Sequence, residues 1–186
     1  FQKVIERITG VKYKIHKRLN RKAVLNALDI YNYTLWEKLR KIGTYKCHSW
    51  HIPNIILEGK ENIKIGFLQG FFDGDGTICQ GRKGKLFPTL TFISTSLEGI
   101  TDIGKLLLSF GIDFTINSNM RLKNKNWKPV YTLHILRKGD VIAYSEVIGF
   151  GKKEHRDKFE KCCITYLSKV KYQNLSNQKG QKIGFN

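Results

Sequence analysis

The segment Gly66–Gly76 restricts the possible folds of this chain more than any other part of its sequence. It continues an apolar stretch at residues 61–72 and places Gly66 and Gly70 four residues apart, about one turn of an α-helix. Glycine inside a helix costs about 1 kcal/mol relative to alanine, so two glycines on one face suggest that a second helix approaches closely there. We therefore predict that Gly66 and Gly70 lie at a helix interface.

Two carboxylates, Asp73 and Asp75, stand at the expected end of this helix. They face the negative end of the helix dipole and repel each other, so a compensating cation is expected, and a hard divalent ion such as Mg²⁺ fits oxygen ligands. An EF-hand loop is excluded, because the positions that need glycine and glutamate hold Ile78 and Gly84. Taken alone, an Asp-Gly-Asp-Gly run also fits a surface turn.

Hydrophobic periodicity predicts an alternation of helices and strand pairs along the chain. Helices are expected at residues 1–9, 33–42, 61–72, 97–110, 140–148 and 152–167, and strands at 11–17, 23–29, 77–80, 86–94, 113–120 and 130–136. The polar and basic residues 168–186 are expected to form a loosely ordered tail.

A weak internal repeat organises these elements. Residues 10–15 match residues 111–116 in pattern, and each copy is followed by a strand and by a helix that ends in Ile-Gly, at 42–43 and at 148–149. We therefore predict one complete α-β-β-α-β-β-α unit at about residues 60–167, preceded by the rear part of a similar unit. The front of that first unit is expected upstream of residue 1.

The charge balance points to a polyanionic partner. The chain has 33 lysines and arginines against 15 aspartates and glutamates, a net charge of +18. A small domain needs a charge of only about 2–8 for solubility, so nucleic acid is the expected partner. No apolar run reaches the length of about 20 residues that spans a bilayer, so no membrane association is expected. With no visible signal peptide, we expect an intracellular protein.

The nine residues Leu68-Gln-Gly-Phe-Phe-Asp-Gly-Asp-Gly76 resemble the signature of the LAGLIDADG homing endonucleases. The segments 51–56 and 149–155 resemble the same family, and the resemblance covers about residues 1–167. It implies an α+β fold of αββαββα units, with saddle-shaped antiparallel sheets packed through the motif helices. On this basis residues 1–58 are the rear of a first half plus a connector, 59–167 a complete second half and 168–186 a basic tail.

The resemblance also implies an activity, that of a site-specific double-strand DNA endonuclease that uses Mg²⁺ or Mn²⁺. Asp75 would bind the metal together with the carbonyl of Gly74, whereas Asp73 would be structural. Lys153 is the best match to the basic active-site residue of the family, and Lys152 is the alternative. Ser96 stands where many members have a glutamine that positions water.

Strands that enter the DNA major groove would carry the recognition residues. Our candidates in the complete unit are Thr77, Gln80, Arg82, Lys85, Thr89, Asn117, Asn119, Arg121 and Lys123, and those in the partial unit are Lys12, Lys14, His16 and Arg18. Several of them are expected to contact only phosphate.

The sequence leaves a second function open, that of a non-cleaving relative acting as an RNA splicing maturase on intron RNA or as a DNA-binding regulator. Asp75 favours cleavage, but cutting both strands needs a second acid from a missing first half, in the same or a separate chain, or from a homodimer partner. We disfavour the homodimer, because residues 1–45 would then be an unexplained half-unit. The host element, an intron or an intein, also stays open.

Overall fold

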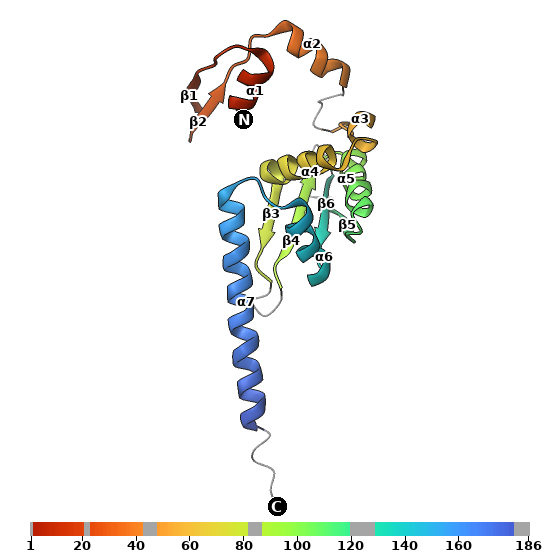
Figure 1. Ribbon diagram of the computed structural model, residues 1–186. Helices are drawn as coiled ribbons and strands as arrows, with labels where there is room; N and C mark the ends of the chain where they lie inside the picture. Colours follow the sequence, from red (N-terminus) through yellow and green to blue (C-terminus); the bar gives the residue numbers. More distant parts are fainter. Residues whose placement is uncertain (1, 21–22, 43–47, 82–86, 120–128, 181–186) are drawn as a thin grey trace, which may run out of the picture. The chain divides into compact units, whose positions relative to one another are not determined.

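The computed structural model describes residues 2–20, 23–42, 48–81, 87–119 and 129–180 (Figure 1). The chain forms two compact units, which divide between Gly43 and Thr44. Residues 48–58, the described part of the expected connector, fall within the second unit. Each unit is described by itself.

The first unit consists of α1 (Gln2–Thr9), β1 (Ile15–Asn20), β2 (Ala23–Leu28) and α2 (Tyr33–Ile42). The two strands are antiparallel, with Ile15 opposite Leu28. Both helices and β2 lie where the sequence predicts them, but β1 begins four residues later than expected. The reason is that Tyr13 is bonded to α1: its backbone N–H donates to Glu6 (3.0 Å) and its carbonyl accepts from Gln2 (2.6 Å).

The second unit contains one four-stranded antiparallel sheet. Along the chain its elements are α3 (Asn54–Leu57), α4 (Glu61–Asp75), β3 (Gly76–Cys79), β4 (Thr89–Ser94), α5 (Leu97–Ser109), β5 (Thr115–Asn119), β6 (Val130–Ile135), α6 (Lys138–Ala143), the π-helical turn η2 (Tyr144–Ile148) and α7 (Lys153–Gly180). The strand order in the sheet is β3-β4-β6-β5. This is the predicted α-β-β-α-β-β-α order, and Figure 1 shows α7 running beside β3.

One face of this sheet forms the core. The buried residues Ile78, Leu90 and Ile135 lie opposite one another on three neighbouring strands, and Phe92 and Leu133 form the next buried row. Helices α4, α5 and α6 pack on this side. Because side chains alternate between the faces of a strand, the residues between these buried positions point to the opposite face, hereafter the open face.

The end of α4 is anchored by Phe72, which is fully buried. Its ring lies among Phe92, Tyr144 and Phe150, with centroid distances of 5.2, 5.5 and 5.3 Å. Strand β3 starts at Gly76, directly after α4, and a Cβ on Gly76 would overlap the Phe72 ring. The last glycine of the motif is therefore required by close packing at a helix-to-strand junction without a loop.

The internal repeat is present in the backbone. Gly10 after α1 and Gly111 after α5 both adopt a left-handed conformation, with φ of +70° and +71°. One prediction was wrong: residues 168–180 are not a loose tail but the continuation of α7. That stretch contains no proline and only one glycine, Gly180, so nothing in it ends the helix earlier.

Candidate functional site

The two aspartates of the motif have opposite environments. The side chain of Asp73 is 16% exposed, and its Oδ1 lies 3.2 Å from Nδ1 of His155 on α7. Asp75, the last residue of α4, is exposed, and no side chain in the described part of the protein pairs with it. Asp73 thus has a partner within the fold, whereas the carboxylate of Asp75 is available to an external cation.

The loop 149–152 wraps around the end of α4. Gln69 donates from Nε2 to the carbonyl of Ile148 (3.1 Å), and Arg156 donates to the carbonyls of Phe150 (2.7 Å) and Gly151 (2.6 Å). A Cβ on Gly151 would collide with the carboxylate of Asp73, so the loop approaches as closely as it does because this residue is glycine. These contacts hold the loop against the C-terminal end of α4.

The two candidate lysines also make different contacts. Lys152 donates to the backbone carbonyl of Asp73, one of the carbonyls that the last turn of a helix leaves without an intrahelical N–H. Its charge therefore lies at the negative end of the α4 dipole. Lys153 instead pairs with Asp157 at 2.6 Å on the surface of α7, and this hydrogen bond raises the pKa of Lys153. The structure places Lys152, and not our first choice Lys153, at the motif.

A divalent cation fits the end of α4, although the chain alone does not enclose it. Asp75 offers a carboxylate, and the carbonyl of Gly74 belongs to the last helical turn, whose carbonyls lack intrahelical donors. No group of three histidines, cysteines or acids able to hold a metal occurs among the described residues. The remaining ligands must therefore come from water, phosphate oxygens or a second acid.

The open face of the sheet presents a polar surface. Its central row crosses all four strands, because Thr91 lies opposite both Thr77 and His134, and His134 lies opposite Thr115. The predicted residues Thr77, Thr89 and Asn117 have this strand parity and are exposed or half-buried. His134 shares this face and was not among the predicted residues, although it alternates with Leu133 and Ile135 along the strand.

Other predicted recognition residues lie elsewhere. Gln80 is past the end of β3, and its Nε2 donates to the carbonyl of Cys162 on α7 (3.4 Å), so it braces the helix and does not point along the open face. Lys12 and Lys14 are exposed but precede β1, for the reason given above, whereas His16 is exposed within β1. Arg18 and Asn119 lie on strands with side chains that are not described, and Arg82, Lys85, Arg121 and Lys123 fall outside the described residues.

Ser96 has a structural role. It caps α5 by accepting from the N–H of Gly99 (3.1 Å), donates to the carbonyl of Trp50 (2.6 Å) and is 1% exposed. Nearby, the buried Asp102 accepts from the N–H of Ile52 (3.1 Å). Ser96 therefore ties the connector to the sheet and is too enclosed to position a water molecule at a reacting phosphate.

The glycine face of α4 is uncovered by the described residues of the second unit. Gly66 and Gly70 are both exposed, and a Cβ on either would meet no atom within 4 Å in the structure. The geometry leaves room for a second helix on this face, as the spacing predicts, and the interface itself stays a prediction.

Comparison with known proteins agrees with the resemblance seen in the motif. Residues 62–149 match the family model described as LAGLIDADG-like domain. A segment of the ribonucleoside-diphosphate reductase NrdEB subunit alpha of Bacillus subtilis (strain 168) is 32% identical over 85 residues, which is 46% of this chain and only 8% of that subunit.

Two solved structures share the fold. The homing endonuclease I-DmoI, in complex with DNA and Mn, superposes with a TM-score of 0.53 at 15% identity, over 81% of this chain and 71% of that one. The homing endonuclease I-WcaI, bound to its DNA recognition sequence, superposes with a TM-score of 0.52 at 16% identity, over 86% and 71% of the two chains. These likenesses confirm the predicted α+β fold.

Proposed function

From the LAGLIDADG-like domain at residues 62–149, we propose that the chain is a site-specific DNA endonuclease that hydrolyses phosphodiester bonds with Mg²⁺ or Mn²⁺. The observation that carries this proposal is the contrast between the two motif acids. Asp73 is paired with His155, whereas Asp75 is exposed at the end of α4 with no partner among the described residues. An unpaired carboxylate at the negative end of a helix dipole favours a cation ligand.

In this proposal each residue has a separate task. Asp75, with the carbonyl of Gly74, would hold a divalent ion, and that ion would supply an activated water and a positive charge for the phosphate. Lys152 neutralises the α4 terminus and places a positive charge beside the scissile phosphate. The open face of the sheet, with Thr77, Thr89 and Asn117, binds the major groove of double-stranded DNA.

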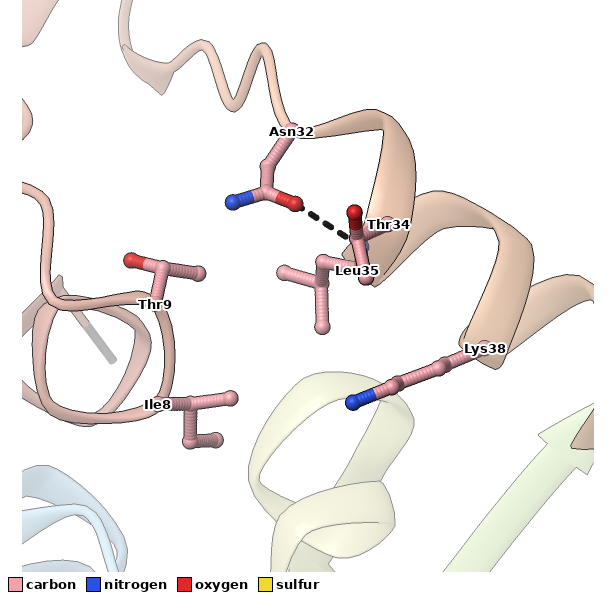
Figure 2. Close-up of a pocket in the computed structure, with 6 residues that line it drawn as sticks. All are labelled: Ile8, Thr9, Asn32, Thr34, Leu35 and Lys38. Carbon is pink, nitrogen blue, oxygen red and sulfur yellow. Dashed lines mark hydrogen bonds between the residues drawn. The ribbon is translucent and has the colours of Figure 1, made fainter.

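The first unit supports the further proposal that a helix from the front of the first half completes this unit. A hollow of about 200 Å³ lies between α1 and α2. Figure 2 shows the residues that line it, which are Ile8, Thr9, Asn32, Thr34, Leu35 and Lys38. On the repeat, in which Ile42-Gly43 matches Ile148-Gly149, Leu35 and Lys38 correspond to Val141 and Tyr144, which are fully buried. Tyr144 reaches the carbonyl of Leu68 on α4 (3.5 Å), so we infer that a helix like α4 belongs over this hollow.

The test is a cleavage assay on duplex DNA that spans the insertion site of the host gene, with each strand labelled separately. The wild-type chain is expected to cut in Mg²⁺ and to stop when the metal is chelated, and Asp75→Asn is expected to bind but not to cut. If only one strand is cut, the result supports the proposal that the second active-site acid comes from outside these residues. If the wild type binds the duplex without cutting either strand, the endonuclease proposal is wrong.

A second candidate is a binding protein without cleavage activity, either an RNA splicing maturase on intron RNA or a DNA-binding regulator. The enclosed position of Ser96 favours it, because that side chain is used for packing. Binding of the intron transcript in place of the duplex would select the maturase.

The host element also belongs to the proposal. The 85-residue match within a reductase subunit, over 8% of its length, supports a sequence that resides inside an unrelated gene, as an intron or an intein does. We propose that the protein acts where such a genomic target lies, in an archaeal or bacterial cytoplasm or in an organelle matrix.

A further inference from the structure

His134 occupies the middle of the open face. It lies on β6, an inner strand of the sheet, between Thr91 on β4 and Thr115 on β5. Its neighbours along the strand, Leu133 and Ile135, are fully buried on the opposite face. No other histidine lies on the described strands of this sheet. The central position of His134 also distinguishes it from the lysines and arginines, which are distributed along the whole chain.

The imidazole ring is held on one side. The hydroxyl of Thr91, a residue that is 6% exposed, lies 3.1 Å from Nδ1 of His134. The other ring nitrogen, Nε2, has no recorded partner among the described residues. A hollow of about 130 Å³ adjoins the ring, lined also by Thr115, Phe114 and Arg137. The side chain therefore presents one free hydrogen-bonding nitrogen next to open space, with its orientation fixed by Thr91.

The electrostatics favour a neutral ring. Burial lowers the pKa of His134 below its ordinary value, so the imidazole is uncharged at neutral pH. Of the charged groups beside it, Arg137 is paired with both Asp113 and Asp140. A neutral, oriented ring is poorly suited to a phosphate, which prefers a cation, but it can donate to or accept from a base edge.

We propose that His134 is a specificity-determining residue that contacts a base edge through Nε2, with Thr91 as the residue that positions it. The inference rests on the proposed binding of duplex DNA by the open face. It predicts that one or two adjacent base pairs of the target are read by this ring.

The experiment uses a library of randomised duplex DNA, from which the full chain selects bound duplexes for sequencing. His134→Ala is expected to relax the preference at one or two adjacent base pairs about 3- to 10-fold and to leave the other positions unchanged. Thr91→Val is expected to relax the same positions by a smaller factor. The matched control is His48→Ala, because Nδ1 of His48 lies 2.9 Å from the hydroxyl of Thr95, which lies just after β4 and outside the strands of the sheet.

The salt dependence of binding separates a base contact from a phosphate contact. Loss of a base contact leaves the slope of log affinity against log salt unchanged, whereas loss of a charged phosphate contact makes it shallower by about one. Uniformly weaker binding with a shallower slope, or an unchanged base profile, would overturn the role of His134. If the wild-type chain enriches no duplex, the proposed function itself fails. Thermal unfolding of each variant identifies a loss of binding that is due to misfolding.

Discussion

The two aspartates of the motif give the sharpest prediction, since they have the same charge two residues apart and opposite expected roles. In Asp75→Asn the fold loses no recorded contact among the described residues, and a negative charge leaves the C-terminus of α4. Removing that charge is worth about 0.3–1 kcal/mol to the helix, so this variant should unfold at the same temperature as wild type or up to about 4 °C higher.

The matched variant Asp73→Asn should behave in the opposite way. Its carboxylate lies 3.2 Å from Nδ1 of His155 and is only 16% exposed. Replacing a charged acceptor by an amide weakens that hydrogen bond by about 1 kcal/mol, which corresponds to a decrease of about 2–4 °C in the unfolding temperature.

Calorimetry and a Mg²⁺-dependent cleavage assay on both variants check the reasoning. Asp75→Asn should lose about a hundredfold or more in cleavage rate, the loss typical of removing one electrostatic contact from an active site. Asp73→Asn should keep measurable cleavage below its unfolding temperature. The assignment of roles is refuted if Asp73→Asn abolishes cleavage without destabilising the fold while Asp75→Asn still cuts.

Three further predictions concern the lysines beside the motif, the buried Phe72 and the His134 ring on the open face. Lys152→Met should reduce cleavage at least about tenfold, whereas the control Lys153→Met should not, because Lys153 is paired with Asp157; equal rates for the two variants would contradict the placement. Phe72→Ala should destabilise the second unit by about 3–5 kcal/mol in urea unfolding, since its ring is fully buried in the aromatic cluster, and a loss below 1 kcal/mol would argue against that core. The pKa of His134 is lower in the folded state than in the unfolded state. As the pH falls, the unfolded state therefore binds a proton at this ring before the folded state does. The free energy of unfolding is thus unaffected by this ring above about pH 6.5 and decreases as the pH falls below that value. His134→Gln should reduce this loss below about pH 6.5, and identical pH profiles would exclude the effect.

Most of the fold was predictable because its elements have strong local signals. Helix α2 occupies the predicted residues, and the left-handed glycines at 10 and 111 mark equivalent helix ends in both copies of the repeat. The late start of β1 arises because tertiary contacts override the local pattern. The alternation at 11–17 indicates a strand, but the hydrogen bonds between Tyr13 and α1 delay β1 to Ile15.

By itself the sequence determined the motif helix, the strand pairs, the repeat and the presence of two acids, because these depend on residue type and spacing along the chain. Only the tertiary structure decided which contacts these residues make. Asp73 meets His155 from a helix 82 positions away in the sequence, and Lys152 reaches the carbonyl of Asp73 across 79 positions. Such contacts depend on how α4 packs against the 149–152 loop and α7, and no periodicity along one chain segment contains that information. The carboxylate of Asp75 is available to a metal because the fold pairs Asp73 with His155, while no described side chain pairs with Asp75.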